Sequence, residues 1–215
     1  MDKLHQFKDF IIKTTHKGIN FYNRQRLTNP NPTIISSDCC GGIISKWLGL
    51  KFNTPFVNLY LNNEDFLSLL ENFDEFIESD IMEDLNSDKP YPVGIGCHGE
   101  RINFMHYPDF STAMEKWNIR KKRINKQNMG IILSNLGEGL KDKEDTRTIL
   151  QRFRNLPFKH KIVLSGEDTF IEEPNVIKLK GFEKRKHINV CYYNPFGRRY
   201  IDTFDYVGFI NSINS

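Results

Sequence analysis

The chain has 215 residues, of which 39% are hydrophobic and 27% are charged, and this composition excludes a wholly disordered or fibrous protein. Its 30 basic and 27 acidic residues leave a net charge of only +3, which argues against a surface that coats nucleic acid. Any anion binding must therefore come from local clusters, and no apolar run is long enough to span a bilayer.

The first predicted element is an amphipathic helix over residues 3–25. Its apolar side chains recur at helical spacing, at Leu4, Phe7, Ile11, Ile19 and Tyr22. We expect this apolar side to dock on the rest of the protein. The alternative is a peripheral membrane contact, because lysine and arginine residues line much of the remaining surface. An Asn-Pro-Asn-Pro segment ends the helix, which divides the chain into a helix at 1–28 and a single domain at 29–215.

The rest of the chain alternates between strands and helices. Runs of β-branched residues predict strands at 33–36, 56–60, 129–133, 161–164 and 176–179. Apolar periodicity predicts helices at 43–48, 64–78, 111–127, 145–156 and 206–213. Two more strands, at 93–97 and 102–106, form a predicted hairpin around Gly99. This order predicts an α/β fold with three layers, in which helices flank a largely parallel sheet of Rossmann-like topology.

The four cysteines, at positions 39, 40, 97 and 191, form no CxxC pair. Their spacing fits neither a zinc motif nor a disulfide framework, so we predict reduced cysteines and no metal site. The N-terminal segment also lacks the features of a secretory signal. We therefore expect a cytoplasmic protein, with peripheral attachment to the inner face of the membrane as the alternative that residues 3–25 leave open.

Three polar stretches should gather at the edge of the parallel sheet where ligands bind. The first, Ser-Ser-Asp-Cys-Cys-Gly-Gly at 36–42, follows a predicted strand. If Gly41 and Gly42 open a helix, their amides favour a negative group, and the pKa of the Cys39 thiol should be lowered. Ser37 is an alternative nucleophile or oxyanion donor. The simpler interpretation is that the cysteines only pack a turn.

The second stretch ends in His106, which a following Tyr-Pro turn would position for acid–base work. A structural or exposed histidine is the alternative, and His98 is a competitor in a glycine-flanked turn. The third stretch is the helix around Trp117, whose flank carries Arg120 and Arg123. We expect Arg120 to be partly buried, and such an arginine binds a carboxylate or a phosphate, so an internal ion pair is the alternative to a ligand.

Two further charged segments carry weaker signals. Residues 62–88 contain ten acidic residues and no basic one, which is typical of a solvated surface. The cluster Phe-Gly-Arg-Arg-Tyr at 196–200 would either join an anion site or form a surface loop.

Together these stretches resemble the family called domain of unknown function 1919, over about residues 30–210. The opening signature of that family is similar to a series of residues near the start of this region, namely the run 33–36, Cys39, Gly41, Gly42, Leu48-Gly49-Leu50 and Thr54-Pro55. Its second signature is similar to His106-Tyr107, Ala113, Trp117, Arg120, Arg123, Ile124, Asn125 and Asn128. One departure is that the family has Asn-Asn-Cys-aromatic-Gly-Gly where this chain has Ser-Asp-Cys-Cys-Gly-Gly. Family members are often labelled exopolysaccharide or capsule biosynthesis proteins, so the resemblance implies cell-surface glycan assembly.

The resulting hypothesis is a transferase that moves an acyl group to a sugar hydroxyl. Its donor would be acyl-coenzyme A, with no tightly bound cofactor, and its partner a glycan or a lipid- or nucleotide-linked sugar precursor rather than nucleic acid. In this hypothesis Cys39 is the nucleophile or helps to frame an oxyanion site, and His106 is the general base. The residues that would hold the substrate or its phosphate are Gly41, Gly42, Trp117, Arg120, Arg123 and Asn125.

Two alternatives remain open. One is a glycosyl- or phosphoryl-transferase with a sugar-phosphate donor, in which the two arginines bind a diphosphate and Cys39 is structural. The other is a non-catalytic module of glycan assembly.

Overall fold

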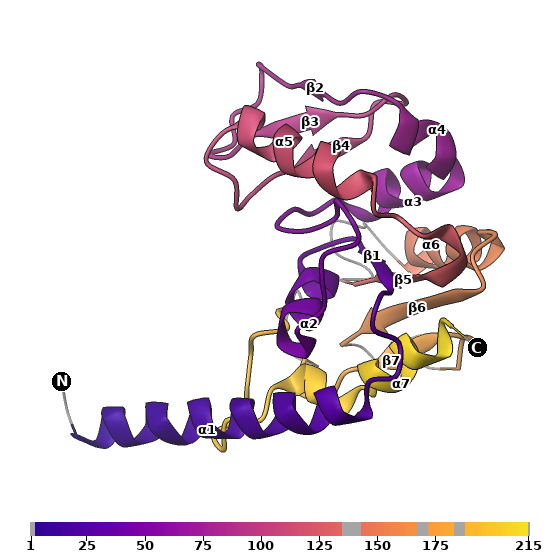
Figure 1. Cartoon of the computed structure of the whole chain (residues 1–215). Helices are drawn as coiled ribbons and strands as arrows, with labels where there is room; N and C mark the ends of the chain where they lie inside the picture. The colour runs from indigo at the N-terminus through magenta and orange to yellow at the C-terminus, as the bar shows by residue number, and fades with distance from the viewer. Residues whose placement is uncertain (1–2, 135–142, 167–171, 183–187, 215) are drawn as a thin grey trace.

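A four-stranded parallel sheet forms the centre of the protein (Figure 1). The structure, a computed structural model, describes residues 3–134, 143–166, 172–182 and 188–214. The strands lie in the order β1 (Thr33–Ser36), β5 (Met129–Leu133), β6 (His160–Ser165) and β7 (Val176–Lys178). All three pairings are parallel, so the carboxyl ends of the four strands share one edge.

Alternate residues of the strands face two separate layers of helices. On one side, Ile35, Ile131 and Val163 contribute to a core with α3 (Asn63–Glu71), α5 (Phe110–Lys121) and α6 (Lys143–Asn155). On the other side, Ile34, Ile132 and Leu164 pack with α2 (Cys40–Leu48) and α7 (Tyr206–Ser212). The predicted α/β class, with three layers and a largely parallel sheet, is confirmed.

A small antiparallel sheet stands beside the parallel one, within the connection from α2 to β5. Its strands are β2 (Met82–Glu83), β3 (Val93–Ile95) and β4 (Arg101–Asn103), and α4 (Phe73–Glu78) packs next to them (Figure 1). The predicted hairpin is confirmed as β3 and β4, with Gly99 in the left-handed region at φ 90°. Only a glycine adopts that conformation without strain.

Two sequence predictions in this region are wrong. The segment 56–60 is not a strand, because Asn58 has a φ of 64° and leaves only an isolated bridge between Tyr60 and Asn103. The single helix predicted over 64–78 is two helices that meet at Asn72. The first of them is capped by the side chain of Asn62, which accepts a hydrogen bond from the backbone of Asp65.

Several helix boundaries also differ from the prediction. Helix α5 begins after Asp109, whose carboxylate caps it, and ends at Lys121 rather than at residue 127. A short 3-10 turn, η1 (Lys126–Asn128), then leads into β5. Helix α2 begins at Cys40 and ends at Gly49, whose φ of 73° closes it as expected.

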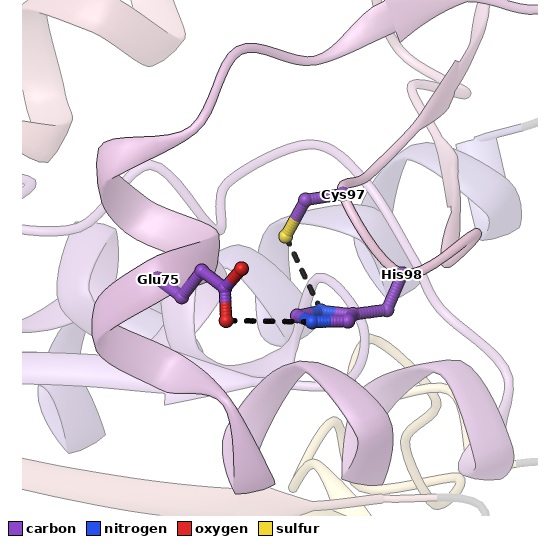
Figure 2. Close-up of side chains that lie close together, drawn as sticks. All are labelled: Glu75, Cys97 and His98. Atoms are coloured by element: carbon purple, nitrogen blue, oxygen red, sulfur yellow. Dashed lines mark hydrogen bonds and ion pairs between the residues drawn. The ribbon is translucent and has the colours of Figure 1, made fainter.

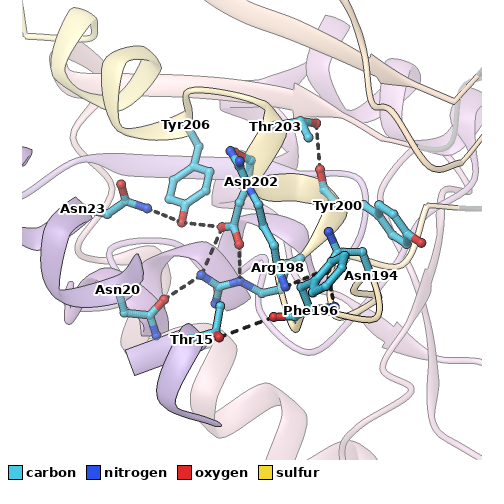
Figure 3. Close-up of polar contacts among 11 residues, drawn as sticks. Thr15, Asn20, Asn23, Asn194, Phe196, Arg198, Tyr200, Asp202, Thr203 and Tyr206 are labelled. Carbon is cyan, nitrogen blue, oxygen red and sulfur yellow. Dashed lines mark hydrogen bonds and ion pairs between the residues drawn. The ribbon is translucent and has the colours of Figure 1, made fainter. Parts of the chain in front are cut away.

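Helix α1 (Lys3–Arg26) docks through the buried Ile12 and through polar side chains. Asn23 donates to the Tyr206 hydroxyl at 2.7 Å, and Arg26 binds both oxygens of Asp205. Figure 3 shows the contact of Asn23 with Tyr206, among the polar contacts between α1 and residues 194–206. Of the residues predicted to face the domain, Phe7 and Tyr22 are 62% and 63% exposed, so the predicted docking face is wrong. The side chain of Leu4 lies outside the described residues.

None of the helices in the described ranges combines the length and the apolar character that crossing a bilayer requires.

Candidate functional site

Cys39 immediately precedes α2, at the edge where the carboxyl ends of the strands meet. The thiol is half-buried and donates to the Leu59 carbonyl at 3.6 Å. Burial, together with the charge of Asp38, raises the pKa of Cys39 to about 11. The lowered pKa that we expected at a helix start is therefore wrong, because Asp38 already occupies this helix end and accepts from the Cys40 amide. The thiol is mostly protonated at neutral pH, which makes it a poor nucleophile.

The glycines and Ser37 serve packing and strand pairing. The Gly41 amide donates to Ser36 Oγ at 3.0 Å, so this amide does not point at a ligand. A Cβ on Gly41 would lie 2.9 Å from Ile34, and one on Gly42 would lie 3.2 Å from Val57. Gly41 lets α2 approach β1 closely, and Gly42 lets it approach the segment at Val57. Ser37 is buried, and its Oγ accepts from the Ser134 amide at 3.0 Å, which links the ends of β1 and β5.

His106 lies in an exposed turn after β4, and its neighbour Tyr107 occupies the position expected for it. Among the described residues, no contact joins His106 to Cys39. The Tyr107 hydroxyl donates to the Val57 carbonyl at 2.9 Å and accepts from Arg120 Nη1 at 2.8 Å. Burial raises the pKa of Tyr107, the charges of Arg120 and Lys116 oppose this rise, and Cys39 adds to it. Tyr107 is therefore the residue that brings Cys39 and Arg120 into one neighbourhood.

Arg120 is half-buried, and no carboxylate of the described residues forms an ion pair with it. Its guanidinium carbon lies 5.3 Å from the centre of the Phe52 ring, and its one hydrogen-bond acceptor in the described part of the chain is the neutral Tyr107 hydroxyl. The internal ion pair that we considered for Arg120 is not found among the described residues. Lys116 lies one helical turn earlier on α5 and adds a second positive charge, which the Glu115 carboxylate, 2.9 Å from its Nζ, partly balances. This arrangement can bind a phosphate or a carboxylate.

The comparisons agree with the signatures on which this site was predicted. Residues 10–211 match the family model described as Domain of unknown function (DUF1919). The chain belongs to this family. It is similar to an uncharacterized protein of Haemophilus influenzae, with 34% identity over 213 residues that cover 98% of this chain and 99% of that protein.

In this DUF1919 chain, the loop 52–59 connects the groups around Arg120. It supplies the Phe52 ring, the Val57 carbonyl that accepts from Tyr107, and the Leu59 carbonyl that accepts from Cys39. The apolar run at 56–60 predicted a strand, which hid this loop. Thr54-Pro55, directly before that segment, is a turn signal that argued against a strand.

Three other residues that were predicted to bind the substrate either lie away from Arg120 or already bond to groups of the protein. Trp117 is 2% exposed and packs edge-on against Phe56 and Phe104, so it belongs to the core and the predicted substrate contact is wrong. Arg123 donates to the Phe52 carbonyl at 3.2 Å. Asn125 lies at the amino end of β1, where its amide donates to Thr33 Oγ1.

In the cluster at 196–200, Arg199 is not available to bind an anionic ligand. This side chain is 1% exposed, binds Asp202 through Nε at 2.9 Å and through Nη2 at 3.0 Å, and stacks on the Trp47 ring. Of the two proposed roles of this segment, an anion site built on Arg199 is excluded because the buried guanidinium already has its carboxylate.

Proposed function

We propose that the chain is a transferase of cell-surface polysaccharide assembly that binds the phosphate of a lipid- or nucleotide-linked sugar precursor at Arg120. The glycan context comes from the resemblance of the sequence to proteins labelled exopolysaccharide or capsule biosynthesis proteins. The phosphate is inferred from the surroundings of Arg120.

The observation that carries the proposal is that Arg120 is half-buried beside neutral groups. A guanidinium presents several N–H donors in a fixed plane, which matches two oxygens of a phosphate. Tyr107 and Phe52 hold the guanidinium in place without neutralising it. A bound phosphate would supply the missing negative charge, and Lys116 would contribute to its binding.

Of the transfers considered, glycosyl or phosphoryl transfer is the one we favour, because it needs only that Arg120 hold the phosphate of the donor. Acyl transfer from acyl-coenzyme A would use Cys39 as nucleophile and His106 as base. The raised pKa of Cys39 and the exposed position of His106 both weigh against that form. Cys39 then contributes to packing beside the site.

The proposal is tested in a strain that lacks the chain, by complementation with the wild type or with Arg120→Ala. We expect loss of a sugar or a phosphate substituent from the surface polysaccharide of the deletion strain, measured by composition analysis and mass spectrometry. Arg120→Ala should restore at most about a tenth of it, since a hydrogen bond to a charged group contributes roughly 1.5–3 kcal/mol.

Lys122→Ala is the matched control, because Lys122 is an exposed base at the end of the same helix, and it should restore the polysaccharide fully. An unchanged polysaccharide in the deletion strain would refute the assignment, and full restoration by Arg120→Ala would refute the role of this residue. Loss of an acyl group alone would identify acyl transfer instead.

We further propose that α1 rests on anionic lipid, as the cytoplasmic leaflet presents it. Phe7, Phe10 and Phe21 are 62%, 66% and 66% exposed. At about 100° per residue they fall within roughly 60° of one another on the helix, on the side opposite the buried Ile12 and Asn23. Exposed lysines at positions 13 and 17 lie on one flank of this stripe. Exposed aromatic residues beside lysines are typical of helices that lie in a membrane interface.

The membrane contact is tested by sedimentation with vesicles of phosphatidylserine and phosphatidylcholine. We expect the wild type to bind these vesicles and to bind pure phosphatidylcholine at least tenfold more weakly, since each lysine contributes about 1 kcal/mol at an anionic surface. The variant Phe7→Ser/Phe10→Ser/Phe21→Ser should lose binding, because each buried phenylalanine contributes about 1.5–3 kcal/mol.

The three substitutions leave the polar contacts of α1 intact, so thermal unfolding should be unchanged and serves as the control. Equal binding of the variant and the wild type, or binding by neither, would contradict the lipid contact.

A further inference from the structure

We propose that Glu75, Cys97 and His98 form a binding site for one zinc ion. Cys97 and His98 lie in the turn between β3 and β4, and Glu75 reaches them from α4 (Figure 2). One ligand atom from each residue, a sulfur, a ring nitrogen and a carboxylate oxygen, lies within 4.8 Å of the other two. The proposal is independent of the site around Arg120.

The three side chains come close enough to share one zinc ion. Glu75 Oε2 lies 3.4 Å from His98 Nε2, the ring nitrogen that would bind the metal. Cys97 Sγ lies 3.3 Å from the other ring nitrogen, Nδ1, and one ligand atom of each residue lies within 4.8 Å of the other two. In a tetrahedral site, with bonds of about 2.3 Å to sulfur and about 2.0–2.2 Å to nitrogen and oxygen, neighbouring ligand atoms lie roughly 3.3–3.6 Å apart. A small rotation of these exposed side chains would direct all three at one ion. A thiolate with an imidazole suits zinc and disfavours magnesium and calcium.

The local backbone holds the turn close to α4. A Cβ on Gly96 would lie 2.4 Å from the Phe76 ring and 2.5 Å from Glu100 Oε2, so only a glycine permits this approach. The turn is closed by hydrogen bonds from the Gly96 amide to the Glu100 carbonyl and from the Gly99 amide to the Gly96 carbonyl. Cys97 and His98 are therefore held on the side of the turn that faces Glu75.

The buried carboxylate of Glu100 lies beside the ring of His98. Glu100 is 1% exposed, accepts from the His98 amide and from Ser68 Oγ, and its Oε1 lies 3.5 Å from His98 Nδ1. A carboxylate in this position orients the ring of a histidine ligand and leaves the other nitrogen, which here faces Glu75, for the metal. The ten acidic residues at 62–88 add a negative potential that attracts cations.

Three protein ligands on an exposed surface leave a fourth position for water or for an oxygen of a bound molecule. This is the pattern of zinc sites with an open position, whereas purely structural sites have four protein ligands. The site should therefore bind zinc reversibly and exchange it for cobalt.

The test is titration of the reduced, metal-free full-length chain with zinc and with cobalt as separate probes. We expect one equivalent of each to bind, competition of zinc with cobalt, and a thiolate-to-cobalt charge-transfer absorption. Cys97→Ser and His98→Ala should lose this absorption, and Glu75→Gln should weaken zinc binding roughly tenfold or more. Cys191→Ser is the matched control, because Cys191 is an exposed cysteine outside the cluster, and it should bind as the wild type does.

The proposal is overturned if the wild type binds neither metal at one equivalent, or if Cys97→Ser and His98→Ala bind zinc as tightly as the wild type. Cys97 and His98 are exposed in a turn, so both variants should retain the circular dichroism spectrum of the wild type, which separates loss of the site from loss of the fold.

Discussion

Replacement of Arg199 by methionine is expected to lower the free energy of unfolding by about 3–5 kcal/mol, since it leaves the buried Asp202 carboxylate without its cationic partner. The same substitution removes the hydrogen bond from Arg199 to Asn20 of α1. A methionine keeps much of the side-chain volume over the Trp47 ring, so lost packing contributes little. Denaturation in urea, followed by circular dichroism, measures the change.

The neighbouring Arg198→Met is the matched control. Arg198 is exposed and its side chain donates only to the Asp202 carbonyl among the described residues, so its replacement should cost about 1 kcal/mol or less. Adding Asp202→Asn to Arg199→Met removes the uncompensated charge and should recover part of the loss. Equal effects of Arg198→Met and Arg199→Met would show that the buried pair does not stabilise this region.

Replacement of Trp117 by alanine should destabilise the protein by about 3–5 kcal/mol, because it opens a cavity in the core. The indole contacts Phe56, Phe76 and Phe104, and so joins α5 to the loop 52–59, to α4 and to the small antiparallel sheet. The expected result is a lower midpoint of unfolding in urea. Arg120 is on the same helix, so unfolding of the variant would also remove anion binding. The anion affinities of the variant and the wild type are therefore compared without denaturant, where both are folded.

Trp117→Phe separates packing from polar contacts. It retains an aromatic ring and removes the buried Nε1 group, which has no hydrogen-bond partner in the described part of the chain, so it should cost less than about half of the alanine effect. A Trp117→Ala variant with wild-type stability but weakened substrate binding would restore the substrate role that the sequence suggested.

The sheet was predictable because its strands are short, buried on both faces and rich in β-branched residues. Thr33–Ser36 and Met129–Leu133 are buried throughout, as their sequences indicated. The failures are local. The pattern of apolar residues at 56–60 predicted a strand. It carried no information on the positive φ of Asn58, which turns the chain. The same pattern could not tell that Phe7 and Tyr22 would face outward. The contacts come instead from Ile12, Asn23 and Arg26.

The candidate site was only partly predictable, for a related reason. The partial burial of Arg120 followed from its place on the flank of an apolar stripe, since position on a helix is periodic. Its partner Tyr107 depends on how a turn is oriented, and the sequence directed attention to His106 beside it. Cysteine spacing likewise indicated no metal site, because the carboxylate near Cys97 and His98 comes from α4, about twenty residues earlier in the chain.

The contacts of α1 have a consequence for the order in which the chain folds. Asn20 and Asn23 bond to side chains 179 and 183 positions later. At a synthesis rate of roughly 5–20 residues per second, these two partners follow α1 by on the order of ten seconds or more. Until then α1 has only earlier partners such as Trp47 of α2, whose carbonyl accepts from Arg24 at 2.8 Å. Full docking of the first helix is thus a late event, and during that interval its phenylalanines are free to meet a lipid surface or a chaperone first.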